Sequence, residues 1–412
     1  MDNKNIQQPN YGFALAVVIL VCFLLGFVTT MNNSMIDFCK QTFKLSESQG
    51  QLVNTAFYGA YILSIPLAFL MNKLGYKITL VLGIGVIAVG FLLNYFGIGI
   101  FAGSDAIYPV FLSCMFIVAI GIVLLQLVAN PYVKALGTLE KGAFRMTLSQ
   151  SFNSAATVIA PLFVSLLIVS GSSGYNEISI RVPFLGLALF TLILTIVLVF
   201  IKLPKIEEGE EKTEGNKEKQ TYKSNVFKYP HVIFGALAIF MYMGVEIGIP
   251  SLMPAKIRAL MASGAIGSDI DPTIFLPWYW GGLLVGRILG TILLNKFKPR
   301  HVLTFALLGG IVCVALSFVL PGMVGIYAMI AAGLFHSVMW PLIFNLAIED
   351  LGHHTKTASG IVSTGVIGAA ILMPLMGWIA QNVALMAAIA LLFVYYLYIL
   401  LFCEKLSKIR TA

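Results

Sequence analysis

The chain has 412 residues, of which 59% are hydrophobic and only 11% are charged, and its mean hydropathy is +0.92. A soluble globular protein carries roughly a quarter of its residues as Asp, Glu, Lys and Arg, so this composition excludes the soluble class. The net charge of +8 does not indicate a nucleic-acid partner, because the basic residues fall in short loops and a central linker. Apolar runs of about 20 residues, the length that crosses a lipid bilayer, recur throughout. They predict an all-α membrane protein.

The apolar runs between polar breaks predict twelve membrane-spanning helices. The first six lie near residues 13–37, 49–72, 77–98, 107–131, 147–170 and 181–202, and the other six near 229–250, 274–295, 301–320, 323–347, 357–380 and 382–403. The segment between the two sets is dense in Glu and Lys, so it cannot bury a core. We therefore predict an N-terminal bundle at 1–202, a charged linker at 203–228 and a C-terminal bundle at 229–412.

The two sets of six spans resemble each other in sequence. Asn72–Lys77 (NKLGYK) follows the second span, and Asn295–Arg300 (NKFKPR) follows the eighth, its counterpart six spans later. Pro131 in the fourth span likewise matches Pro341 in the tenth. Such weak repetition is typical of transporters built from two repeated halves, with the substrate site between them near the bilayer midplane. The predicted fold is therefore a pair of pseudo-symmetric six-helix bundles.

The distribution of basic residues predicts the orientation in the membrane. Most of the 26 Lys and Arg residues lie on one side if the N-terminus and the linker are cytoplasmic, as the positive-inside rule requires. The first apolar run is too long for a signal-peptide core and has no cleavage-site pattern before it, so we expect it to remain as a span. We expect a monomeric, multi-pass protein of the bacterial inner membrane with both termini in the cytoplasm.

Two charged side chains lie deep inside predicted spans. Glu246 stands in YMGVEIGIP of the seventh span, and Arg287 in GGLLVGRILG of the eighth. A lone carboxylate at the membrane centre costs about 2.5–3.5 kcal/mol on insertion scales, so Glu246 requires a partner, a proton or a cation. Two interpretations stay open: a structural ion pair of Glu246 with Arg287, or contact of Glu246 with substrate or a coupling ion.

Uncharged amides form a second group of polar side chains in the spans. Two pairs are spaced four and three residues apart, so that each pair shares a helix face. Amides offer donors and acceptors without charge, which suits a neutral polyhydroxylated ligand; the alternative is that they join helices for ~0.6 kcal/mol each. The candidate substrate-binding amides are Asn32, Asn33, Gln126, Asn130, Gln150, Asn153 and Asn345.

Aromatic residues supply a third group of candidates. The sequence Trp278-Tyr279-Trp280 opens the eighth span, where such rings are more often interfacial anchors, and we assign the cluster mainly to that role. Trp340 precedes a proline inside the tenth span, and a flat indole face with an N–H donor can stack on a sugar ring. His336 lies one turn earlier, and a lone histidine is more often a packing residue than a functional one.

Several motifs resemble a known transporter family. AFLMNKLGYK at 68–77 is similar to the loop between the second and third helices of the major facilitator superfamily. MNNSMI in the first span, TAFYGAY at 55–61, ANPYVKALG at 129–137 and FRMTLSQSFN at 144–153 resemble its sugar permeases related to the fucose, glucose and galactose symporters. The resemblance covers essentially all twelve spans and implies sugar transport by alternating access.

The resemblance also implies roles for the loop after the second span. In the superfamily an acidic residue and basic residues of this loop latch the two halves in one state. The matching gating-loop residues here are Asn72, Lys73, Gly75 and Lys77. Because Asn72 occupies the acidic position, we expect a weaker latch.

The coupling ion is where this chain departs from its apparent relatives. Fucose-type members have an aspartate in the first helix and a glutamate in the fourth, used for proton coupling and substrate binding. Asn33 and Gln126 stand at the matching positions, and neither carries a proton at ordinary pH. The glutamine resembles glucose- and galactose-type relatives, some of which are sodium-coupled. Glu246 is then the carboxylate left in the membrane core, and we expect it to take part in proton or sodium symport.

The sequence therefore predicts a transporter that imports a hexose or related sugar, with no cofactor or metal beyond a coupling proton or sodium ion. An uncoupled facilitator remains an alternative. A second alternative is a non-transporting sugar sensor, which the short linker and tails disfavour because they leave no room for a signalling domain. An intramembrane enzyme requires a nucleophile–base set or a metal cluster, and the histidines other than His336 fall at span ends or in loops.

Overall fold

The computed structural model describes residues 11–45, 47–50, 52–136, 141–164, 180–201, 203–204, 225–267 and 274–408. The helices of the first half, called the N half, are α1 (Tyr11–Thr42), α2 (Glu47–Gly50), α3 (Leu52–Gly59), α4 (Ser64–Phe101), α5 (Ile107–Ala135), α6 (Gly142–Phe163) and α7 (Arg181–Phe200). Those of the second half, called the C half, are α8 (Pro230–Glu246), α9 (Gly248–Ala262), α10 (Leu276–Leu293), α11 (Pro299–Val319), α12 (Gly322–His336), α13 (Met339–Ala347), α14 (Thr355–Thr364), α15 (Gly368–Asn382) and α16 (Leu385–Glu404).

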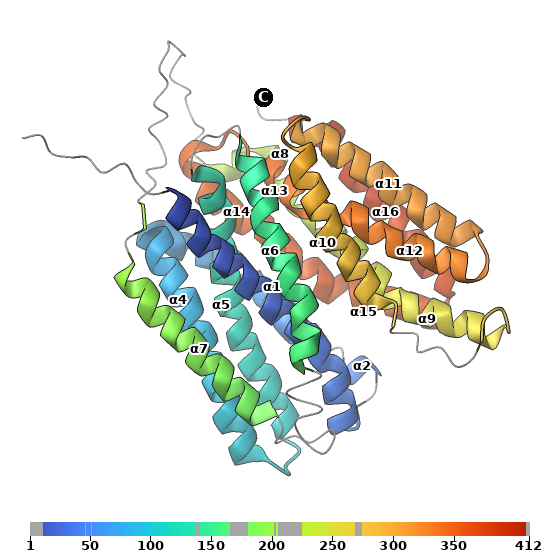
Figure 1. The fold of residues 1–412 in the computed structure, drawn as a ribbon, viewed down its shortest axis with the longest axis horizontal. Coiled ribbons are helices and arrows are strands. Elements are labelled where there is room, and N and C mark those ends of the chain that lie inside the picture. The colour runs from blue at the N-terminus through green and yellow to red at the C-terminus, as the bar shows by residue number, and fades with distance from the viewer. Residues whose placement is uncertain are drawn as a thin grey trace, which may run out of the picture.

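The two halves lie side by side, with the N half in blue to green and the C half in yellow to red (Figure 1). Across their boundary α6 packs on α10 and α13, α4 packs on α14, and α3 packs on α15. The outer faces carry exposed apolar side chains, of which Phe200, Val319 and Val182 are 79%, 76% and 75% exposed. Such a surface suits hydrocarbon and would aggregate in water. The exposed surface therefore fits a protein surrounded by lipid.

The helices account for twelve spans. Nine stretches of the described chain are long and apolar enough to cross a membrane, and one of them, Leu52–Phe101, has 50 residues. Gly75 interrupts this stretch with φ 75° and ψ 172°, a conformation that glycine adopts without the steric penalty of a side chain. The stretch therefore contains the second and the third span. α6 and α10 fall outside these nine stretches, and they complete the set.

Within the described residues, four spans are interrupted near their middle. The 3-10 turn η1 (Ala60–Leu63) joins α3 to α4, and η7 (Gly365–Ile367) joins α14 to α15. Ile247 separates α8 from α9, and the step 337–338 separates α12 from α13. Interrupted helices leave backbone groups without partners, which a membrane protein tolerates where other side chains or a water-filled cavity satisfy them. The interruptions therefore indicate where to look for a site.

Most predicted span limits agree with the helices to within a few residues. α1 continues to Thr42, five residues beyond the predicted end at 37, because no proline or glycine stops it there. α6 begins at Gly142, before the predicted start at 147. Of the linker predicted at 203–228, residues 205–224 lie outside the described part of the chain, so the division into two domains with this linker stays a prediction.

Candidate functional site

A cavity of about 120 Å³ lies between the two halves, at the level of the helix interruptions. Its walls come from α1, α3, η1, α5 and α6 on one side and from α8, α10, α13 and η7 on the other. The lining residues are Leu25, Gly26, Thr29, Thr30, Asn33, Tyr58, Tyr61, Gln126, Gln150, Asn153, Ser154, Thr157, Met243, Glu246, Ile247, Trp280, Leu283, Arg287, Trp340 and Val366.

Six of the nine residues predicted to bind substrate line this cavity. They come from both halves and are Asn33, Gln126, Gln150, Asn153, Glu246 and Trp340. Asn33 donates from Nδ2 to the Tyr58 hydroxyl at 3.4 Å, and its buried Oδ1 has no hydrogen-bond partner in the described structure. An unpaired buried acceptor is costly unless a ligand or water completes it. The Asn33 amide is therefore suited to receive a hydroxyl donor from a bound molecule.

The other three predicted residues, Asn32, Asn130 and Asn345, do not line the cavity. Asn32 is fully buried and donates to the side chain of Asn54 at 3.4 Å. Asn130 turns back along its own helix and donates to the backbone oxygen of Gln126 at 2.9 Å. Asn345 is buried in α13, where its backbone oxygen accepts a hydrogen bond from Lys134 at 3.5 Å. The Asn32 and Asn130 amides therefore make hydrogen bonds between and along helices.

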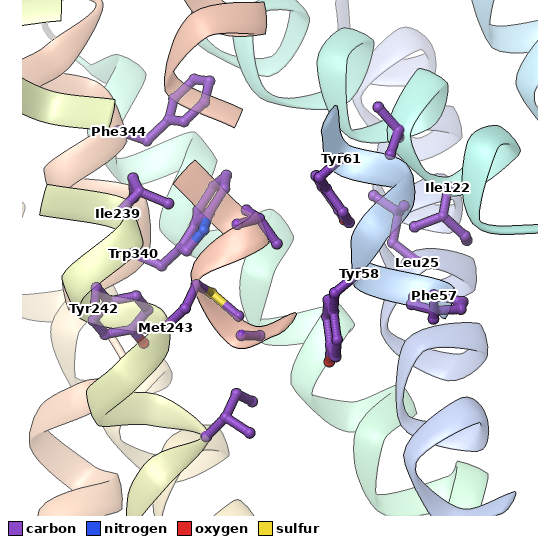
Figure 2. Close-up of a cluster of buried hydrophobic side chains, with 14 of the residues drawn as sticks. Leu25, Phe57, Tyr58, Tyr61, Ile122, Ile239, Tyr242, Met243, Trp340 and Phe344 are labelled. Carbon is purple, nitrogen blue, oxygen red and sulfur yellow. The ribbon is translucent and has the colours of Figure 1, made fainter. Parts of the chain in front are cut away.

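Two tyrosines on the cavity wall were not predicted. Tyr61 lies on η1, and its hydroxyl donates to Gln126 Oε1 at 2.5 Å. This bond fixes the orientation of the Gln126 amide, with its oxygen toward Tyr61. Figure 2 shows Tyr58 and Tyr61 on one side and Trp340 with Met243 on the other. The sequence signal for both tyrosines was TAFYGAY, which spans the end of α3 and the start of η1.

The structure places the three residues of the 278–280 cluster in three different environments. Trp278 is 68% exposed, as expected for an anchor. Trp280 lines the cavity, and Tyr279 is fully buried with its hydroxyl bonded to the backbone oxygen of Glu246 at 2.8 Å. Successive residues of a helix point about 100° apart, so three aromatic neighbours face three different environments.

Arg287 joins the ion pair to the opposite half. Its Nη2 lies 3.8 Å from Glu246 Oε1, within the C half. Its Nη1 donates to the backbone oxygen of Gln150 at 3.0 Å, to Asn153 Oδ1 at 3.4 Å and to the Ser154 hydroxyl, all on α6 of the N half. The structural ion pair considered from the sequence is present. It also forms part of the cavity wall, so pairing and ligand contact are compatible.

Prolines free backbone carbonyls that side chains from other helices then bind. A proline has no N–H, so the carbonyl four residues before it loses its helical donor. Pro250 frees the carbonyl of Glu246, to which Tyr279 donates at 2.8 Å. Pro341 frees the carbonyl of Ser337, which accepts from Arg287 Nε at 3.0 Å.

The third case crosses between the halves. Pro131 frees the carbonyl of Leu127 in α5, and the hydroxyl of Ser359 in α14 donates to it at 3.4 Å. The prolines thus create acceptors that tie interrupted or bent helices to their neighbours.

Comparison with known proteins places this architecture in a family. The family model of the Major Facilitator Superfamily matches residues 18–374. The chain belongs to the Major Facilitator Superfamily. It is 34% identical over 404 residues to the glucose/galactose transporter of Brucella abortus, covering 97% of this chain and 95% of that one. It is 28% identical over 405 residues to the L-fucose-proton symporter of Escherichia coli, covering 92% of this chain and 90% of that one.

A solved structure supports the same conclusion. The crystal structure of the superfamily transporter FucP, in the outward conformation, superposes with a TM-score of 0.78 and 26% identity, covering 96% of this chain and 98% of that one. The predicted resemblance and the twelve-helix fold in two bundles are therefore confirmed. The named relatives are transporters, which confirms that this multi-pass membrane protein is not an enzyme.

The loop predicted to gate this superfamily member lies at the end of the bundle that carries the linker. Asn72 donates from Nδ2 to the hydroxyl of Thr357 in the C half at 2.8 Å. Lys77 donates to the backbone oxygen of Val199 in its own half at 2.8 Å, while Lys73 is exposed. A neutral amide–hydroxyl bond between Asn72 and Thr357 therefore joins the halves at this end.

Proposed function

We propose that this protein is a sugar transporter that imports a hexose of the glucose or galactose type by alternating access. The proposal is carried by the cavity between the halves, in which amides, hydroxyls and aromatic rings surround a single ion pair. Amide and hydroxyl groups match the donors and acceptors of a neutral sugar, and indole faces match its apolar C–H faces. Two of its relatives, a glucose/galactose transporter and an L-fucose-proton symporter, support the same substrate class.

The proposed contacts come from both halves, so that bound sugar holds them together. Asn33 offers its unpaired Oδ1, and Gln126 offers its amide nitrogen, because its Oε1 already accepts from Tyr61. Gln150 and Asn153 face the same space from α6, and Trp340 and Trp280 form the facing wall. Glu246 accepts a sugar hydroxyl or a coupling cation at the centre.

We propose symport with a proton or a sodium ion through Glu246. The carboxylate lies on the cavity wall with 12% of its side chain exposed, and its contact with Arg287 is 3.8 Å long. A loosely paired carboxylate leaves one oxygen for another partner. The alternative of uncoupled diffusion is favoured by Asn33 and Gln126, the uncharged residues at positions where carboxylates were expected for proton coupling.

We propose that the linker end faces the cytoplasm of a bacterial inner membrane and that this structure represents the outward-facing state. At the linker end the halves are joined by Asn72 with Thr357 and by Ser359 with the Leu127 carbonyl. Adding a Cβ at Gly360 would bring it to 2.3 Å from the Cβ of Ala68, so the helices α14 and α4 are in close contact there. Closure of this end leaves the opposite end as the route of entry.

The test is uptake by purified protein in liposomes, measured with labelled D-glucose, D-galactose and L-fucose. Each sugar is offered with and without a sodium gradient and a pH gradient. Accumulation driven by sodium alone identifies sodium symport, accumulation driven by pH identifies proton symport, and equilibration without accumulation identifies a facilitator. Binding without flux of any sugar would indicate a sensor. Neither binding nor flux of any of the three would contradict a sugar function.

A further inference from the structure

A buried chain of hydrogen bonds leads away from Glu246 into the C half. Glu246 is the last residue of α8, and Pro250 leaves its backbone carbonyl without a helical donor. The Tyr279 hydroxyl donates to this carbonyl at 2.8 Å. The same hydroxyl oxygen lies 2.7 Å from His336 Nδ1, and His336 Nε2 contacts the hydroxyl of Tyr396. Tyr279, His336 and Tyr396 have no exposed surface.

For a neutral His336, the hydrogen-bond partners fix the direction of every proton in this series of bonds. A carbonyl oxygen only accepts, so Tyr279 must give its single proton to Glu246. Its oxygen can then only accept from His336, which places the imidazole proton on Nδ1. In a neutral imidazole, Nε2 is then an acceptor, and Tyr396 donates to it. With a neutral ring, one arrangement of protons therefore satisfies all three bonds, and it defines the tautomer.

The backbone of His336 is held as well. The hydroxyl of Tyr242 in α8 donates to the backbone oxygen of His336 at 2.9 Å. His336 is the last residue of α12, so its backbone lies at the interruption of the tenth span. Its ring contacts Tyr279, which binds the interruption of the seventh span between α8 and α9. Arg287 binds the carbonyl of Ser337 one residue later. The two interruptions that flank the ion pair are therefore linked through His336.

We propose that His336 is a positioning residue for Glu246. It does not line the cavity; it orients Tyr279, whose hydroxyl holds the freed Glu246 carbonyl and so sets where the carboxylate stands relative to Arg287. The inference deepens the proposed function, since it rests on Glu246 acting in sugar or ion binding. Without the Nδ1 donor, Tyr279 is free to rotate, the step between α8 and α9 loses the side-chain hydrogen bond that Tyr279 supplies, and the carboxylate leaves its place.

The first experiment measures the backbone directly, by hydrogen–deuterium exchange of the full chain in detergent or nanodiscs. Tyr279→Phe and His336→Leu are expected to speed exchange at Ile247, Gly248 and Ser251 by about tenfold, the loss of one buried hydrogen bond. His336→Asn is expected to restore protection, because its amide nitrogen can stand where Nδ1 stood. His231→Leu is the matched control: His231 is equally buried in the C half and contacts the Glu349 carbonyl at 3.2 Å.

The second experiment is a double-mutant cycle on uptake of labelled D-glucose or D-galactose. His336→Leu is expected to raise KM about tenfold in the wild-type background, with a smaller change in maximal rate. In a Glu246→Gln background the same substitution is expected to add little, because residues that act through one another are not additive. If His336 had a purely structural role, His336→Leu would impair uptake by the same factor in the wild-type and the Glu246→Gln backgrounds.

The outcomes separate this proposal from the proposed function. Unchanged exchange at 247–251 in both Tyr279→Phe and His336→Leu would overturn the positioning role, as would an additive cycle. If the wild type moves none of the sugars, the proposed function fails, and the exchange result alone decides whether His336 holds the step. If His336→Leu does not fold, the two single variants Tyr279→Phe and His336→Asn provide the test. The proposal then requires faster exchange in Tyr279→Phe and wild-type protection in His336→Asn.

Discussion

A methyl group added at Gly360 tests how the two halves meet at the linker end. Gly360 lies in α14, and the Cβ of an alanine there would come within 2.3 Å of Ala68 Cβ and 3.0 Å of the Ser64 backbone oxygen in α4. Carbon atoms in contact sit about 3.5–4.0 Å apart. The helices must therefore separate by roughly 1 Å or more, which would also strain the Asn72–Thr357 bond of 2.8 Å nearby.

The size of the effect follows from the cost of overpacking. Extra atoms in a close-packed contact cost about 1–3 kcal/mol. That cost falls only on the state in which the linker end is closed, so Gly360→Ala shifts the ratio of closed to open molecules by roughly 5- to 150-fold toward opening. The intrinsic gain of alanine over glycine in a helix, about 1 kcal/mol, is shared by both states. It does not affect the ratio.

The assay is a distance measurement between nitroxide labels at Lys73→Cys in the N half and Lys296→Cys in the C half. Both positions are exposed at the linker end, and the five native cysteines are buried. Gly360→Ala is expected to increase the long-distance population. Gly377→Ala is the matched control, because a Cβ there meets no atom within 4 Å. An unchanged distance distribution in Gly360→Ala would refute the argument that this contact closes the linker end.

Three further predictions concern the latch, the cavity wall and the ion pair. Asn72→Ala and Thr357→Val should each shift the equilibrium toward an open linker end by about 0.5–1.5 kcal/mol. The shift is measured with nitroxide labels at Lys296 and at an exposed N-half site other than Lys73. The double variant should shift the equilibrium no more than one single variant does, and full additivity would argue against the bond. Trp340→Leu should raise KM for D-glucose or D-galactose about tenfold, whereas Trp278→Leu, at an exposed position, should leave it unchanged; equal effects would contradict a stacking role. Arg287→Met should nearly abolish uptake because it leaves Glu246 buried without its ion-pair partner, and it should lower the free energy of unfolding by about 3–5 kcal/mol. Thermal stability should recover when Glu246→Gln is added. No recovery would show that the lost bonds of Arg287 to α6 destabilise the protein more than the lost ion pair does.

Hydropathy and the position of proline could be interpreted from the sequence because they act locally. The spans follow from apolar length, and the prolines at 131 and 341 indicate bends without any knowledge of neighbouring helices. Pro250 carried the same signal four residues after Glu246. It predicts a freed carbonyl at Glu246, but the identity of the donor, Tyr279, depends on how α10 packs against α8.

The amides show where local periodicity stops being informative. Gln126 and Asn130 lie four residues apart and share a helix face, as predicted, yet only Gln126 lines the cavity. Asn130 has a local acceptor, the Gln126 carbonyl at 2.9 Å, and turns toward it. Spacing determines the direction of the Cα–Cβ bond; the rotamer beyond it depends on competing partners. Tyr61 was missed for a related reason, since its direction is set by the 3-10 turn η1.

The most direct test of the account is whether sugar binds beside the cavity tryptophans. The chain has four tryptophans; Trp280 and Trp340 line the cavity, whereas Trp278 and Trp378 are 68% and 59% exposed. With Trp278→Phe and Trp378→Phe in place, D-glucose or D-galactose should change the fluorescence of the remaining two saturably, and Gln126→Ala should weaken or abolish that change. A fluorescence change that appears only when Trp278 or Trp378 is present, or one that Gln126→Ala leaves intact, would contradict a sugar site in this cavity.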